Sequence, residues 1–153
     1  MARLEDFGEP LRSRLEQLEC AGFADAPWSS AKPMNERRVA IVSTAGLQRR
    51  GDRPFDLGSA DFRVIPGDTP AREIVMSHIS TNFDRSGFQA DINVALPIDR
   101  LRELADNGTI GSAAGYHYSF MGATDPTLMK VHAERMIALM KDDGVDTALL
   151  VPI

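Results

Sequence analysis

Apolar residues recur at three- and four-residue steps in three segments of the chain, which is the spacing of one buried helix face. The first segment lies near the N-terminus, the second begins at Pro97 and ends at Asn107-Gly108, and the third begins at Asp125-Pro126 and ends at Gly144. Proline in a first turn and glycine just past a last turn are typical of helix ends. The pattern therefore predicts three helices. Their apolar positions are Phe7, Leu11, Leu15 and Leu18; Ile98, Leu101, Leu104 and Ala105; and Met129, Ala133, Met136, Ile137 and Met140.

Short apolar runs rich in β-branched residues lie between the first two of these helices and after the last one, as in strands that are buried on both faces. These runs occupy residues 38–44, 62–65, 74–77 and 146–151. Because short strands alternate with helices, the pattern predicts an α/β domain, a layered structure with a mostly parallel sheet flanked by helices. We expect this domain to occupy residues 38–153, and residues 1–37 to form an N-terminal helix and a linker.

The composition of the chain excludes several classes of protein. The chain has 153 residues, a formal net charge of -5 and one cysteine. The acidic balance argues against a nucleic-acid or anionic-membrane partner, and a lone cysteine excludes an intrachain disulfide. No run of about 20 apolar residues and no secretory leader is present, so we expect a cytoplasmic protein.

Two histidines stand in favourable places for chemistry. His78 follows a predicted strand and opens a long polar segment that also holds Asp84 and Asp91. His117 lies between Tyr116 and Tyr118 in a block bracketed by glycines. An imidazole at the end of a strand can act as an acid or base, but it can equally bond its own loop.

We therefore take His78 and His117 as candidate catalytic residues. The candidate substrate-binding residues are Tyr116, Tyr118, Asp84 and Asp91. Tyrosines in such a block also commonly belong to the core. The spacing of the histidines matches no metal motif, so we expect no metal and no cofactor. Cys20 lies near Glu16 and Glu19, which disfavour a reactive thiolate.

Three blocks of sequence together resemble a known family. The long block from Ile74 to Gly122 contains the run PIDRLREL, then IGS, then HYSFMG. The other two are 39–46 (VAIVSTAG) and 62–69 (FRVIPGDT). In combination they resemble the selenoprotein B family of glycine, sarcosine, betaine and D-proline reductases, and most of all the small subunit of the D-proline reductase type. The resemblance covers residues 38 to 151.

The resemblance implies reductive cleavage of a C–N bond in an amino-acid-like substrate. In the family, a selenocysteine or a cysteine attacks the α-carbon and displaces the amine, and a neighbouring cysteine resolves the adduct. D-Proline reductase binds its substrate amine on a pyruvoyl group of a partner subunit. A partner subunit is therefore expected here as well, and the exposed end of the last strand favours a homo-oligomer.

The sequence departs from the family pattern where the nucleophile is expected, just after the strand at 146–151. Ile153 is the last residue given, and the 153 residues contain no selenocysteine and no cysteine pair. One hypothesis is that a selenocysteine codon, UGA, follows the Ile153 codon. The alternative is a module that binds a small ligand or a partner subunit and has lost the reductase chemistry.

Overall fold

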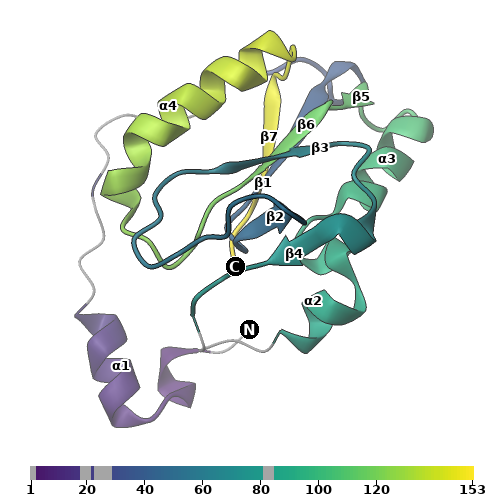
Figure 1. Cartoon of the computed structure of the whole chain (residues 1–153). Helices are drawn as coiled ribbons and strands as arrows, with labels where there is room; N and C mark the ends of the chain where they lie inside the picture. The colour runs from purple at the N-terminus through teal and green to yellow at the C-terminus, as the bar shows by residue number, and fades with distance from the viewer. Residues whose placement is uncertain (1–2, 18–21, 23–28, 81–84) are drawn as a thin grey trace.

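The structure is a computed structural model that describes residues 3–17, 22, 29–80 and 85–153 (Figure 1). The helices are α1 (Glu9–Glu16), α2 (Ser86–Ala90), α3 (Ile98–Asp106) and α4 (Pro126–Asp142). The strands are β1 (Arg38–Ser43), β2 (Leu47–Arg49), β3 (Arg63–Pro66), β4 (Ile74–Met76), β5 (Ser112–Ala113), β6 (Tyr116–Ser119) and β7 (Thr147–Val151). Short 3₁₀ turns η1 (Leu4–Asp6), η2 (Met34–Glu36), η3 (Ala71–Glu73) and η4 (Ile92–Val94) lie between them.

Strand β1 is the centre of a five-stranded sheet. On one side it pairs in parallel with β7, residue by residue from Val39 to Ser43. On the other side it pairs in parallel first with β5 and then with β6. Strand β3 completes the sheet, antiparallel to β6. Strands β2 and β4 form a separate antiparallel ribbon. The predicted α/β fold class, with a mostly parallel sheet between helices, is confirmed.

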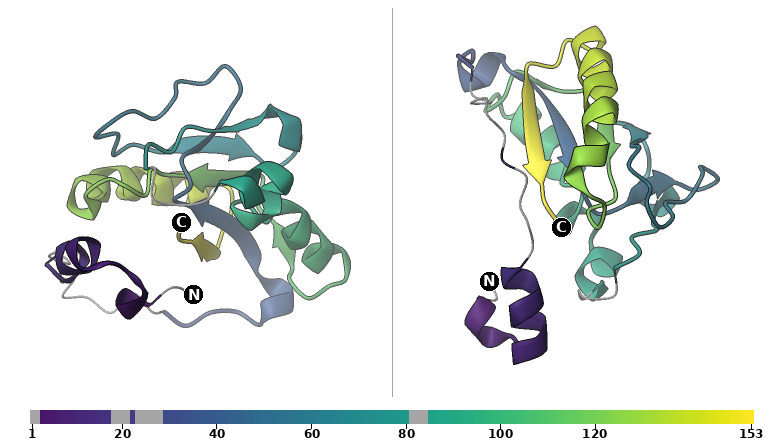
Figure 2. Two further views of the ribbon diagram at one scale, coloured as in Figure 1. Left: turned by 90° about the horizontal axis from the view of Figure 1, so that it is seen from below. Right: turned by 90° about the vertical axis from the view of Figure 1, so that its left-hand side faces the viewer.

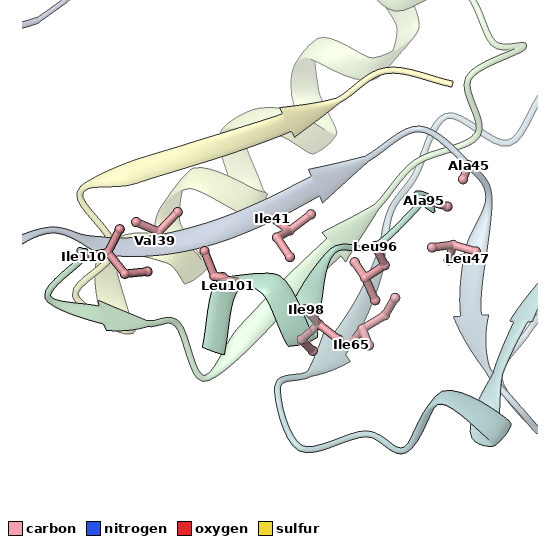
Figure 3. Packing of buried hydrophobic residues seen from close by; sticks show 10 residues of the cluster. All are labelled: Val39, Ile41, Ala45, Leu47, Ile65, Ala95, Leu96, Ile98, Leu101 and Ile110. Atoms are coloured by element: carbon pink, nitrogen blue, oxygen red, sulfur yellow. The ribbon is translucent and has the colours of Figure 1, made fainter. Parts of the chain in front are cut away.

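The two faces of β1 carry two separate cores, which explains why its sequence is apolar without alternation. Val39 and Ile41 pack against Leu101 and Ile110 on the α3 side, as Figure 3 shows. Ala40 and Val42 pack on the α4 side. Their neighbours there are Tyr118, Phe120, Met136 and Met140. Helices α3 and α4 therefore cover opposite faces of the sheet.

Most predicted elements are present with bounds shifted by a residue or two, as expected for helix and strand ends. Four elements were not predicted, namely strands β2, β5 and β6 and helix α2. Strand β2 is fixed by pairing with β4, and β5 and β6 are fixed by pairing with β1. Elements of two to five residues are too short to show a period in the sequence.

The N-terminal helix is present as α1, which begins after Gly8 and has proline in its first turn. None of its residues is buried. The later part of the predicted helix, including Leu18 and Cys20, lies outside the described residues. Among the helices of the described ranges, none is both long enough and apolar enough to cross a membrane.

Shortening Ile41 tests the burial of β1 on its α3 face. The Ile41 side chain is completely buried in the core under α3, so Ile41→Ala leaves a cavity and should lower the free energy of unfolding by about 2–5 kcal/mol. Urea denaturation measures the change. Leu57→Ala is the control, because Leu57 is 88% exposed and should change stability little. Equal effects of the two substitutions would contradict the position of β1.

Candidate functional site

The parallel strands β1, β6 and β7 end together at one edge of the sheet, where the last residue of the sequence lies. Thr44 Oγ1 accepts a hydrogen bond from the Ile153 N–H (2.8 Å), and the Thr44 N–H donates to the Val151 carbonyl (3.1 Å). A Cβ on Gly122 would lie 2.9 Å from the carbonyl oxygens of both Thr44 and Ile153. The tip of β7 is therefore packed closely against backbone from two neighbouring strands.

The side chain of His117, the second residue of β6, bridges an interruption in the pairing of β1 with β5 and β6. Strand β5 pairs with Arg38 and Val39, and β6 resumes the pairing at Val42. Between these points the Ile41 N–H donates to His117 Nδ1 (3.1 Å), so the imidazole replaces a missing backbone acceptor. Because Nδ1 accepts this bond, the hydrogen-bonding pattern assigns the proton of the neutral ring to Nε2.

Burial keeps the His117 imidazole neutral. The side chain is completely buried, and this burial, assisted by the positive charge of Arg102, lowers the pKa of His117 from 6.5 to about 4. Its Nε2 has no hydrogen-bond partner among the described residues. A buried donor without an acceptor is unfavourable by about 1–3 kcal/mol, so His117 presents an unused N–H at neutral pH.

An ion pair holds the chain in place beside His117. Arg38 Nη2 bonds Asp143 Oδ1 (2.6 Å), and Asp143 Oδ2 accepts from the N–H groups of Gly115 (2.8 Å) and Tyr116 (3.2 Å). Burial acts to raise the pKa of Asp143, but the bonds from Arg38 and from the two backbone N–H groups lower it on balance. The sequence analysis missed this pair. The one available signal was an arginine at the start of a buried strand.

A cavity of about 460 Å³ lies at the amino end of β6. Its walls include Gly67, Ile98, Arg102, Tyr116 and His117. Arg102 Nη1 bonds Asp99 Oδ1 (2.7 Å), and Arg102 Nη2 donates to the Gly67 carbonyl. The cavity thus combines a fixed cation, the carboxylate side chain of Asp68 and a neutral imidazole, with Tyr116 at its border. Arg102 was not predicted as a site residue, because a single arginine on the polar side of a helix carries no distinctive signal.

The two tyrosines beside His117 lie on one face of β6, opposite to the His117 side chain, because side chains alternate along a strand. Tyr116 is 47% exposed; it borders the His117 cavity and also a second cavity on the α4 face, which Tyr118 lines with it. Tyr118 is buried on that face, edge-to-face against Phe62 at 5.8 Å between ring centroids. Burial, and then the charge of Asp143, raise the pKa of Tyr118. The structure therefore places both tyrosines on the α4 face, Tyr118 in the core and Tyr116 at its exposed end, where it borders the His117 cavity.

His78 contacts a different part of the chain from His117. It is buried, its Nδ1 accepts from the Ser80 N–H (3.1 Å), and its carbonyl accepts from Arg85 (2.6 Å). Burial, followed by the charge of Arg85, lowers the pKa of His78. Its backbone lies so close to Gly46, which has a φ of +64°, that a Cβ there would be 3.0 Å from the His78 nitrogen. His78 thus packs beyond the carboxyl end of β1, whereas His117 binds its middle.

Asp91 does not join either candidate histidine in the described part of the chain. Asp91 is exposed and caps η4 by accepting from the Asn93 N–H (2.9 Å), and this backbone bond, with that from the Asn93 side chain, lowers its pKa. Asp84 lies outside the described residues. Within those residues, no group of three histidine, cysteine or acidic side chains is placed to hold a metal ion.

Comparison with known proteins gives one family match. A family model described as glycine/sarcosine/betaine reductase selenoprotein B matches residues 26–152. No solved structure matches the chain. The family match includes both histidines and the whole of the sheet.

Three curated relatives are similar over most of this chain. D-proline reductase subunit gamma of Acetoanaerobium sticklandii is 34% identical over 122 residues, which are 78% of this chain and 50% of the relative. The betaine reductase complex component B subunit beta of Peptoclostridium acidaminophilum is 28% identical over 126 residues (78% and 28%). The corresponding sarcosine reductase subunit is 28% identical over 131 residues (81% and 30%).

The chain therefore spans half the length of the first of these relatives and less than a third of the other two. The resemblance of the sequence blocks around Ile41, Ile65 and His117 to the selenoprotein B reductases is confirmed. On the family match and on these relatives, the chain belongs to the glycine/sarcosine/betaine reductase selenoprotein B family.

Proposed function

We propose that this chain forms part of a reductase complex that cleaves the C–N bond of a small amino-acid-like substrate. Its relatives are named as subunits of D-proline, betaine and sarcosine reductases. The 153 residues hold a single cysteine and no selenocysteine. The attacking selenolate or thiolate is therefore proposed to lie on a residue outside this sequence, with a partner subunit completing the complex.

The reaction proposed is a displacement followed by a reduction. The nucleophile forms a bond to the α-carbon while the C–N bond breaks, and the amine leaves with the electron pair and takes up a proton. A neighbouring thiolate then attacks the selenium or sulfur atom. The α-carbon departs with the electron pair of the broken bond and is protonated, and a dithiol reductant must later reduce the resulting selenosulfide or disulfide.

The observation that supports the substrate site is that His117, whose buried Nε2–H has no partner among the described residues, lines the same cavity as Arg102. Two donors of this kind suit a carboxylate, because an arginine supplies charge and the imidazole supplies a neutral hydrogen bond. Tyr116 and the acidic Asp68 border the same cavity. We assign substrate contact to His117, and to His78 the positioning of the segment that follows β4.

The alternative function is a module that binds a small ligand or a partner subunit without reductase chemistry. The same cavity would then hold a carboxylate ligand that is not turned over. The two functions differ in whether a nucleophile is encoded next to these residues. They also differ in whether the assembled protein consumes an amine substrate.

Sequencing the DNA beyond the Ile153 codon separates the two. Under the reductase proposal we expect an in-frame UGA, or a cysteine codon, followed by further coding sequence with a nearby cysteine. An ordinary stop codon with no downstream frame would contradict it and favour the binding module. The measurement needs no protein and does not depend on the substrate.

Calorimetric titration of the full chain with D-proline tests the carboxylate site. In His117→Asn the side-chain oxygen can still accept from Ile41, but the Nε2–H is lost, so affinity should fall by about tenfold or more. His132→Asn on α4 is the control, since His132 lies outside the cavity. Equal affinities of the two variants for D-proline would show that His117 does not contact the ligand. Absence of any binding to the parent chain would contradict the site itself.

The pH dependence of stability tests the neutral state of His117. Its pKa is about 4 in the folded chain, against 6.5 as the ordinary value. Between these values the unfolded chain binds a proton that the folded chain does not, so the free energy of unfolding rises with pH. The stabilisation is complete above the unfolded pKa and is lost as pH falls toward the folded one, by about 3 kcal/mol in all.

Urea midpoints from about pH 7 to about pH 4 measure this loss. His117→Asn should be much less destabilised by acid than the parent chain, whereas His132→Asn should follow the parent. Acid-sensitive groups that do not interact with His117 contribute equally to all three proteins and cancel in the comparison. Parallel curves for His117→Asn and the parent would show that His117 is not held neutral by burial.

A further inference from the structure

Strand β7 is an unprotected edge of the main sheet. It pairs with β1 and with no other described strand. Its five residues, Thr147–Val151, include no charged residue, proline or glycine. Natural edge strands usually carry such residues, or are covered, because an open edge pairs readily with another strand. The right-hand view in Figure 2 shows β7 on the outer side of the sheet, next to β1.

Two leucine side chains of β7 are much more exposed than the residues paired with them on β1. Leu149 is 41% exposed and Leu150 is 68% exposed. Their partners in register on β1 are Ile41 and Val42, both buried. The apolar side chains are thus buried on β1 but exposed on the neighbouring strand β7. Exposed apolar side chains grouped in this way are typical of a surface that another polypeptide covers.

Helix α4 continues this apolar surface. Leu139 lines a cavity with Val64 and Tyr118, so its side of α4 faces β3 and β6. Ile137 lies two residues earlier, about 160° around the helix, and therefore on the side that faces β7. It is 46% exposed. Leu150 and Ile137 then lie on the same face of the sheet, because Leu150 is in register with Val42 of the core under α4.

The backbone of β7 determines which pairing is possible. The Val151 carbonyl accepts from the Thr44 N–H, so Val151 directs its backbone groups to β1. Backbone direction alternates along a strand, so Ala148 and Leu150 direct their N–H and C=O groups to the open edge. An antiparallel partner must therefore place its own outward-facing residues opposite Ala148 and Leu150.

We propose that the β7 edge is the interface with a second copy of this chain, paired antiparallel about a two-fold axis at Leu149. This register sets Ala148 of one copy opposite Leu150 of the other, and these opposed residues exchange both of their backbone hydrogen bonds. It also sets a small side chain against a large one on the α4 face. The two Leu149 side chains meet across the axis on the α3 face.

Charge on α4 fits the same two-fold axis. Glu134 and Lys141 flank Ile137 on the side toward β7 and form no ion pair within the described residues. In an antiparallel arrangement centred near Ile137, Glu134 of one copy faces Lys141 of the other. The opposite charges favour this orientation. Lys32 forms an ion pair with Asp146 (2.9 Å), the residue just before β7. This contact does not extend over Thr147–Val151.

The oligomeric state of the full chain tests the interface. Light scattering and sedimentation at tens of micromolar should give twice the 16.7 kDa mass of the chain. Leu150→Lys places a charge in the contact and should weaken association by about tenfold or more. Leu57→Lys is the matched control, because Leu57 is an exposed leucine in the loop between β2 and β3. It should leave the dimer intact.

A cysteine pair tests the register. With Cys20→Ser in the background, Leu149→Cys should form an intermolecular disulfide under mild oxidation, because the two residues meet at the axis. Leu150→Cys should not, because its counterpart lies opposite Ala148. A monomeric parent chain would overturn the proposal and leave this edge to another polypeptide. An unaffected dimer in Leu150→Lys, or equal crosslinking at both positions, would also overturn it.

Discussion

The structure depends on the requirement that every buried N–H of β1 finds an acceptor. Strand β1 is buried on both faces, so water cannot reach its backbone. Its pairing with β7 is continuous, but on its other side the strand meets two short strands with a gap between them. His117 closes that gap at Ile41. The fold thus fixes the orientation and the tautomer of the imidazole before any ligand is considered.

The same gap explains the ion pair beside it. Where β5 ends and β6 begins, the N–H groups of Gly115 and Tyr116 leave the ladder and bind the Asp143 carboxylate. Arg38 neutralises that carboxylate and also donates to the Ala113 carbonyl (3.0 Å). The cavity beside His117 is therefore bounded by backbone that several charged contacts hold in place. A binding group set on such a support loses little conformational freedom when a ligand arrives.

The elements that could be predicted from sequence are those with a period long enough to read. The apolar run of β1 and the spacing of Met136 and Met140 in α4 indicated burial, and both residues of that pair are in the core. Strands β2, β5 and β6 and helix α2 could not be predicted, because pairing with distant strands and a few local bonds fix them. The position of His117 in the aromatic block was recognised, but its bond to Ile41, 76 residues away, follows from the sheet register alone.

The pairing of β1 with β7 also affects how the protein is made. The two strands are separated by more than 100 residues, and each is the other's most extensive contact. During synthesis β1 leaves the ribosome long before residues 147–151 exist, so one side of an apolar strand stays open while translation continues. Contacts this distant in sequence slow folding and expose chains to aggregation. We expect nascent chains to need chaperone protection until the last strand is released.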